Sequence, residues 1–191
     1  EGIVRLSPLE QNILSPHELE SHIRAIAASA TAQDAARSSD PGVPRAATII
    51  LPDLAVRLAV LQLQELPWSS EEREALVRWR LSQDQLLSLA GAKVFSQILS
   101  EPGVSGEGPC TVLAVVVQEV VLAQYEAVCE AAGLIPQEVD ISSLRMFNLW
   151  AQGAGRTVQS AADYLWVNAT DGGVTAFIFH QGTLVFLRSK L

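Results

Sequence analysis

The sequence predicts a mixed α/β protein in which helices cover β-sheets. Apolar runs typical of buried strands alternate along the chain with helices that have one apolar face. The final part of the chain adds three short strands joined by glycine-bearing turns. Apolar residues make up 49% of the 191 residues and charged residues only 18%, so the chain has the composition of a folded globular protein.

The first helix is predicted to begin at Ser15, where the residues match a helix start. Ser15 can cap the first amides, Pro16 suits the first helical position, and Glu18 completes a capping box. Apolar residues then recur at helical spacing, at Leu19, Ile23, Ile26, Ala27 and Ala30. Residues 29–44 lose this spacing and are rich in Ala, Ser, Asp, Gly and Pro, so we expect a connector there.

Two strands and a second helix are expected next. Residues 46–51 form an almost unbroken apolar run, which is typical of a buried strand. Residues 56–61 alternate in a way that fits a strand with one face more buried than the other. Ser69 starts a second capping box, and the helix behind it is expected to continue to about Leu89.

A loop, a strand and a third helix are predicted in the middle of the chain. Residues 101–109 are too rich in glycine and proline for regular structure, and we expect a loop. The apolar residues 111–117 predict a strand. The helix that follows has its inward residues at Val121, Tyr125, Val128, Cys129 and Ala132, and Gly133 closes it.

A short strand and a fourth helix precede the last segment. Residues 139–141 have the apolar pattern of a strand. Ser142 or Ser143 is expected to cap a helix that continues through Leu149. Glycines within residues 153–155 then break the chain, which suggests a boundary there.

The final segment, residues 164–187, predicts a three-stranded meander. Asp171-Gly172 and Gln181-Gly182 lie where hairpin turns require positive φ. The first turn, residues 168–173 (NATDGG), has two alternative uses. It either reverses the chain, or its backbone amides cradle a phosphate group.

Composition excludes several classes of function. A net charge of −8 argues against a nucleic-acid partner, because phosphate binding needs a basic face. No apolar run is long enough to span a bilayer, and the first residues lack the features of a secretion signal, so we expect a cytoplasmic protein. We expect no metal site from the three histidines, and no catalytic dyad stands out; the histidines are His17, His22 and His180.

Several segments together resemble the PilM family of actin-like pilus-assembly proteins. They are residues 46–53 (AATIILPD), the helix at 71–80 (EEREALVRWR), the strand at 112–117 (VLAVVV) and residues 125–133 (YEAVCEAAG). The cytoplasmic domain of the secretion platform protein GspL is similar, so the pattern also resembles GspL.

The resemblance implies an incomplete actin-like ATPase fold of the ribonuclease H-like type with a small inserted α/β subdomain. Residues 1–66 would form part of the first actin-like subdomain, and residues 67–155 the inserted subdomain. Residues 156–191 would begin the second actin-like lobe with the three-stranded meander.

The resemblance also implies a partner. Proteins of this kind are cytoplasmic scaffolds of a type IV pilus or type II secretion inner-membrane platform, and they bind the N-terminal tail of a PilN-like membrane protein. The chain would then be associated with the inner membrane only through its partner, and it could form a homo-oligomer. Groove walls are expected from residues 46–51, 56–61 and 67–149.

A phosphate loop is expected at the first turn of the meander, in degenerate form. In the family this loop resembles Asp-Ile-Gly, and the matching residues here are Asn168, Ala169 and Thr170. An amide is a weaker ligand for a hard cation than a carboxylate, and threonine obstructs the approach of a phosphate where glycine permits it. A shifted loop could use Asp171, Gly172 and Gly173. We therefore expect no cofactor; the alternative is a fragment of an ATP-binding enzyme of the actin-like superfamily, with ATP and magnesium bound by a longer or related protein.

Overall fold

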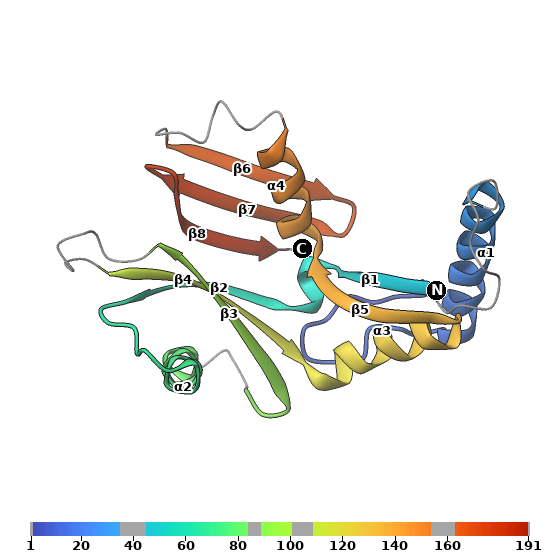
Figure 1. Ribbon diagram of the computed structural model, residues 1–191, viewed down its shortest axis with the longest axis horizontal. Helices are drawn as coiled ribbons and strands as arrows, with labels where there is room; N and C mark the ends of the chain where they lie inside the picture. The colour runs from blue at the N-terminus through green and yellow to red at the C-terminus, as the bar shows by residue number, and fades with distance from the viewer. Residues whose placement is uncertain (1, 35–44, 84–88, 101–108, 154–162, 191) are drawn as a thin grey trace.

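The computed structural model describes residues 2–34, 45–83, 89–100, 109–153 and 163–190. Within these ranges the chain forms four α-helices and eight strands, and the strands make three separate sheets (Figure 1). The predicted mixed α/β class, with helices covering sheets, is confirmed.

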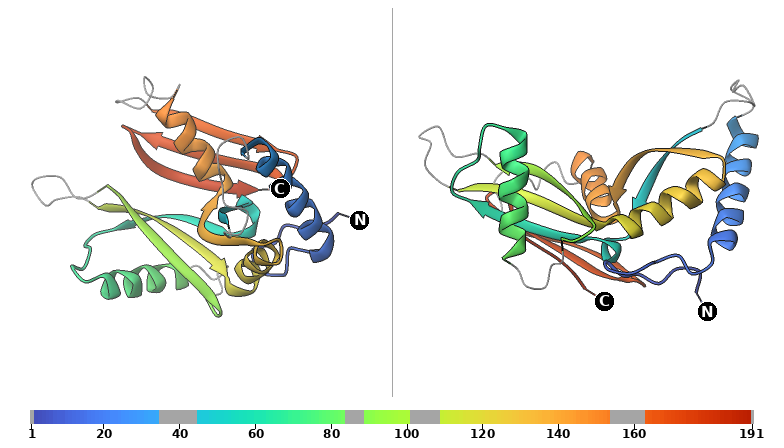
Figure 2. Two further views of the ribbon diagram at one scale, coloured as in Figure 1. Left: turned by 45° about the vertical axis from the view of Figure 1, so that its right-hand side comes forward. Right: turned by 90° about the horizontal axis from the view of Figure 1, so that it is seen from below.

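The first sheet consists of two parallel strands, β1 (Arg45–Leu51) and β5 (Leu134–Ile141). The helix α3 (Glu119–Ala131) covers one face of this sheet, and α1 (Pro16–Asp34) lies beside α3 (Figure 2). β5 is longer than the predicted strand at 139–141 and includes a proline, which an edge strand tolerates. The core between this sheet and α3 contains Ile49, Leu51, Val56, Val117, Leu122, Cys129 and Ile141.

The second sheet is antiparallel, with β4 (Cys110–Gln118) between β2 (Arg57–Leu63) and β3 (Ala92–Ser100). The helix α2 (Ser70–Ser82) packs on one face of this sheet. Val77 and Leu81 of the helix form a core there with Leu63, Ala92, Val112, Ala114 and Val116. Leu113 points to the other face and joins the core under the meander. Residues 112–117 of β4 form an unbroken apolar run, as expected for a strand with both faces buried.

Several predicted boundaries change. β3 was not predicted, and α2 ends at Ser82 rather than near Leu89. α1 continues to Asp34, so the expected connector does not begin at residue 29. The remainder of that connector, residues 35–44, lies outside the described residues. The same holds for most of the expected loop at 101–109, and for two of the three residues of the expected break at 153–155.

The third sheet is the predicted meander of β6 (Tyr164–Thr170), β7 (Gly173–His180) and β8 (Thr183–Lys190). The helix α4 (Ser142–Gln152) covers its inner face with an aromatic cluster, in which Phe147 contacts four other rings. The same inner face packs on the second sheet. This core contains Leu113, Phe177, Phe179, Leu184 and Leu187.

The two turns of the meander differ. Gln181 and Gly182 have φ values of 49° and 76°, as predicted for a two-residue hairpin turn. Asp171 and Gly172 do not have the predicted positive φ; instead, Gly173 has a φ of 145°. A Cβ atom on Gly173 would lie 2.5 Å from the carbonyl oxygen of Lys190, because β8 passes directly beside it.

Strand pairing crosses the predicted boundary between residues 66 and 67. β1 pairs with β5 and β2 pairs with β4, so each pair joins a strand from before that boundary to one from after it. The division into subdomains at residues 1–66, 67–155 and 156–191 stays a prediction.

Replacing Gly173 with alanine is expected to lower the free energy of unfolding by roughly 2–3 kcal/mol, because backbone strain and a backbone clash add together. Gly133 is the matched control, since its φ of 81° is also positive but no atom lies within 4 Å of the added Cβ. Gly133→Ala should cost only about 1 kcal/mol. Urea denaturation of both variants tests this, and equal losses would contradict the close approach at Gly173.

Candidate functional site

A cluster of polar side chains centred on Asp53 joins the first sheet, α4 and the meander. Asp53 Oδ1 accepts the backbone N–H of Ser143 at 2.9 Å, and Oδ2 accepts the Ser143 hydroxyl. Oδ2 also accepts the Thr175 hydroxyl at 2.7 Å. The Asn168 amide donates to Ser143 Oγ at 2.9 Å. Because the Thr175 proton is directed to the carboxylate, Ser189 donates the 2.9 Å hydrogen bond to Thr175 Oγ1.

The parallel pairing of β1 and β5 brings Asp53 and Ser143 together. Leu51 lies opposite Ile141 in the register, and each strand supplies a polar residue two positions later. The carboxyl ends of adjacent parallel strands meet at the same edge of a sheet, so the two side chains face each other.

Asp53 caps the start of α4. The predicted capping of this helix by the side chain of Ser142 or Ser143 is wrong, because the N-cap residue is Ile141 and makes no side-chain cap hydrogen bond. The Asp53 carboxylate instead accepts a hydrogen bond from the backbone N–H of Ser143, one of the amides that have no partner within the helix. Its negative charge also interacts favourably with the positive end of the helix dipole.

The cluster is held by neutral donors. Ser143 and Thr175 are 0% and 2% exposed, so their hydroxyl groups need internal partners and find them in Asp53. Among the described residues, Asp53 takes part in no ion pair. These contacts are therefore a structural joint between three parts of the chain.

Four of the five residues predicted for the phosphate loop line a small pocket beside this joint. Asn168, Thr170, Gly172 and Gly173 contribute to its wall, and Asp171 does not. The pocket has a volume of about 60 Å³, and Asp53 also lines it. The Thr170 hydroxyl donates to the Gly173 carbonyl oxygen at 3.3 Å.

The small pocket is smaller than most ligand sites, and its charged group is acidic. Ligand sites usually have volumes of about 300–1,000 Å³. The charged side chain in its lining is a carboxylate, which repels phosphate, and no Lys or Arg lines it within the described ranges. In the same part of the chain, no group of three His, Cys, Asp or Glu side chains is placed to hold a metal ion.

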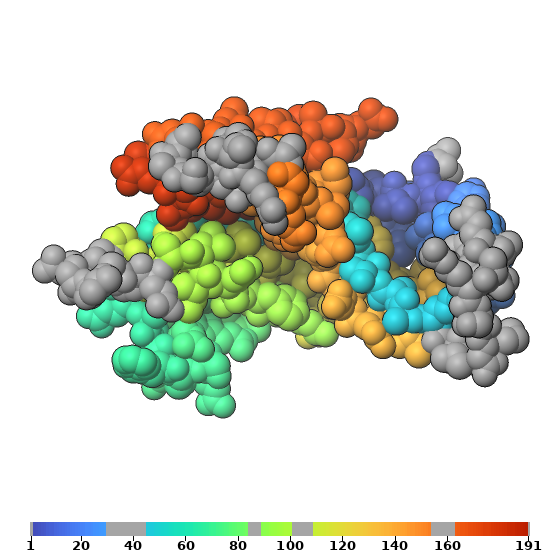
Figure 3. Space-filling model, turned by 45° about the horizontal axis from the view of Figure 1, so that its top comes forward, coloured from blue at the N-terminus to red at the C-terminus, as the bar shows by residue number. Residues whose placement is uncertain are grey.

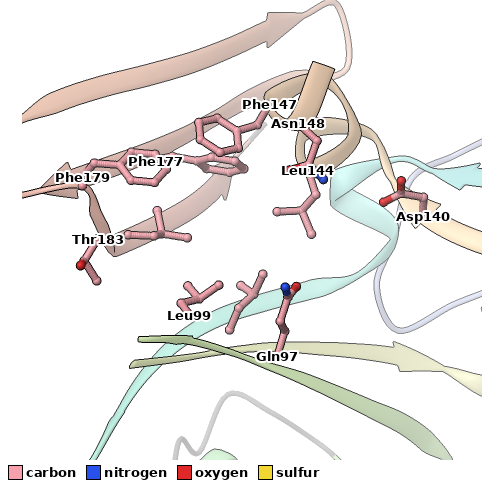
Figure 4. Close-up of a pocket in the computed structure, with 12 residues that line it drawn as sticks. Gln97, Leu99, Asp140, Leu144, Phe147, Asn148, Phe177, Phe179 and Thr183 are labelled. Atoms are coloured by element: carbon pink, nitrogen blue, oxygen red, sulfur yellow. The ribbon is translucent and has the colours of Figure 1, made fainter. Parts of the chain in front are cut away.

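A larger pocket lies between the second sheet and the meander, and we call it the inter-sheet pocket (Figure 4). Its volume is about 290 Å³. Its lining residues are Gln97, Leu99, Leu113, Asp140, Leu144, Phe147, Asn148, Phe177, Phe179, Gly182, Thr183 and Leu184. Asp140 lies at one end of the pocket and Thr183 at the other, with apolar side chains between them (Figure 4).

Aromatic stacking forms one wall of the inter-sheet pocket. Phe147 stacks on Phe179 with the ring centroids 5.0 Å apart and meets Phe177 edge-on at 5.6 Å. Such contacts fix ring positions, so this wall is preformed. Leu99 from β3 and Leu113 from β4 form the opposite wall.

The mouth of the pocket is polar and its end is acidic. Gln97, Asn148 and Gly182 line the pocket and are exposed to solvent. Asp140 accepts the N–H of Ile141 at 2.7 Å and lies 3.7 Å from the Arg145 guanidinium, a long and half-exposed ion pair. Asp140 therefore keeps capacity to meet another cation.

The lining of the inter-sheet pocket differs from the groove expected from the sequence. Residues 46–51 and 56–61 contribute no lining side chain, whereas β3, β4, β5 and α4 contribute from within residues 67–149. The rest comes from β7, β8 and the turn between them, which sequence reasoning had not assigned to a groove. The Asp53 joint was not predicted from the sequence either. The pattern that could have revealed it is the polar residue that follows each of the strands β1 and β5, Asp53 and Ser143.

The class that these features define is a mixed α/β protein of three sheets with an apolar pocket between two of them. Its fold is similar to that of a chain in a PilM–PilN type IV pilus biogenesis complex, with a TM-score of 0.73 and 17% sequence identity. The similarity covers 98% of this chain and 51% of that chain, so this chain spans about half the length of its structural relative. The resemblance predicted from the sequence motifs is thus confirmed as a likeness of fold.

Comparisons of the amino-acid sequence with known proteins identify no relative of this chain. No protein-family model matches the chain, and no curated protein matches it by sequence. None of the helices in the described ranges is long and apolar enough to cross a membrane.

Replacing Asp53 with asparagine is expected to lower the free energy of unfolding by about 1–3 kcal/mol, because the carboxylate accepts three hydrogen bonds and asparagine can satisfy fewer. Asp171 is the matched control, since it is exposed and makes the same change of charge. Asp171→Asn should stay within about 0.5 kcal/mol of the parent. Guanidinium unfolding curves check both values, and an unaffected Asp53→Asn would show that the joint is not stabilising.

Proposed function

We propose that the protein is a non-catalytic scaffold of a type IV pilus or type II secretion inner-membrane platform, and that it binds the N-terminal tail of a PilN-like membrane protein. The inter-sheet pocket is the observation that carries this proposal. The fold similarity to a chain of a PilM–PilN complex supports the choice of partner class.

The inter-sheet pocket suits a short peptide segment. At about 290 Å³ it takes a few apolar side chains rather than a whole domain. Its preformed aromatic wall lowers the cost of ordering on binding. The exposed Gln97 and Asn148 at the mouth offer amide groups that can hydrogen-bond to a peptide backbone.

Charge also favours a tail next to a membrane span. Cytoplasmic segments that flank membrane spans are rich in Lys and Arg. The whole chain has a net charge of −8, and Asp140 places an acidic group at one end of the pocket. Opposite charges raise the rate of encounter and fix the register of the bound segment. Association with the inner membrane would then come through this partner.

The proposal treats the fold as actin-like without its ATPase chemistry. Among the residues predicted for the phosphate loop, Asn168 already donates to Ser143, and the Thr170 hydroxyl donates to the Gly173 carbonyl oxygen. The pocket beside them holds about 60 Å³. Calorimetric detection of magnesium–ATP binding by this chain would instead favour the alternative, a fragment of an ATP-binding enzyme.

Filling the mouth of the pocket should weaken tail binding. Asn148→Trp places a large ring at the mouth and is expected to weaken binding by tenfold or more, on the order of 1.4 kcal/mol or greater. Met146→Trp is the matched control on the same helix, since Met146 is 51% exposed and does not line the pocket. Fluorescence anisotropy with labelled N-terminal tail peptides of the PilN-like proteins of the same organism measures both.

The two variants separate the possible outcomes. Equal affinities for Asn148→Trp and the parent chain would show that the tail binds elsewhere. Failure of the parent chain to bind any of these tail peptides would overturn the proposed function. Thermal unfolding of both variants controls for loss of fold.

A further inference from the structure

β3 presents a free backbone edge beside the inter-sheet pocket. It is an outer strand in the order β2-β4-β3, and within the described ranges it pairs only with β4. Its backbone groups on the other side therefore have no strand partner in that part of the chain. Figure 3 shows atoms of β3, in light green, at the surface between α2 and α4.

This edge lacks most of the features that protect exposed strands. Protected edges are short, or carry prolines, several charges or a central bulge. β3 has nine residues, one charged residue (Lys93) and no proline, and its irregularity lies at the far end, between Ile98 and Ser100. Phe95 and Ile98 are 55% and 37% exposed along it. An edge of this kind is suited to pairing with another strand.

The same strand forms part of the pocket wall. Gln97 and Leu99 of β3 both line the inter-sheet pocket (Figure 4). A strand added to the free edge would lie about 4.8 Å from β3. Every second side chain of that strand would then be directed to the same face as Gln97 and Leu99, toward the pocket.

We propose that the occupant of the pocket binds as an added β-strand along β3. It is an extended segment that carries an apolar side chain for the inter-sheet pocket and a Lys or Arg for Asp140 at the pocket's end. Main-chain hydrogen bonds to β3 supply sequence-independent affinity, and the pocket supplies specificity. This inference rests on the proposed function and specifies the chemistry and conformation of the tail.

Hydrogen exchange by NMR tests the inference on the complete chain with a saturating tail peptide. In the free protein, the amides within residues 93–99 that are not bonded to β4 should exchange rapidly, and the peptide should slow them by roughly tenfold or more. β6 is the control edge, because it is the outer strand of the meander, away from β3. Its amides should keep their rates.

Peptides methylated at backbone nitrogens provide the second measurement. Methylation at alternate positions removes main-chain donors and keeps every side chain, so one register of methylation should weaken binding tenfold or more and the other should not. A tail that binds, is blocked by Asn148→Trp, and leaves the β3 amides unprotected would overturn strand addition while the proposed function stands. No binding of any tail peptide would overturn both.

Discussion

The carboxylate of Asp53 holds three parts of the chain in one arrangement. It follows β1, accepts hydrogen bonds from the backbone N–H and the hydroxyl of Ser143 in α4, and accepts one from the hydroxyl of Thr175 in β7. α4 extends from this joint to the inter-sheet pocket, where Leu144 and Phe147 line the wall. The position of that wall therefore depends on how the Asp53 joint fixes the start of the helix. The joint also uses Asn168, one of the residues predicted for the phosphate loop, as a donor to Ser143.

Local patterns predicted much of the fold because local forces specify those elements. The meander, the strands β1, β2 and β4, and the helices α1 and α3 follow from periodicity, caps and turn residues. β3 was missed because residues 95–98 are all exposed, so the strand has no alternation between a buried and a solvated face. The Asp53 joint was missed because it depends on the pairing of β1 with β5, which are about 90 residues apart in sequence. The inter-sheet pocket was not predicted for the same reason, since contacts between distant segments decide which side chains meet.

The first turn of the meander was predicted as either a chain reversal or a phosphate cradle. Its geometry supports the first use. Gly173 provides the close approach of β7 to β8, and Asn168 supports the Asp53 joint. The space that remains beside this turn is small and acidic, whereas the apolar inter-sheet pocket has about five times its volume. The proposed recognition of an apolar and basic peptide therefore rests on the inter-sheet pocket and not on the turn.

Photo-crosslinking tests the central claim, that a membrane partner's tail enters the inter-sheet pocket, most directly. Benzoylphenylalanine in place of Asn148 would lie at the mouth of the pocket, and in place of Leu165 it would lie on β6, where that residue is 62% exposed. With the PilN-like protein present, position 148 should give a crosslink to its N-terminal tail, mapped by mass spectrometry, and position 165 should not. A tail that crosslinks from position 165 and not from position 148 would contradict the account.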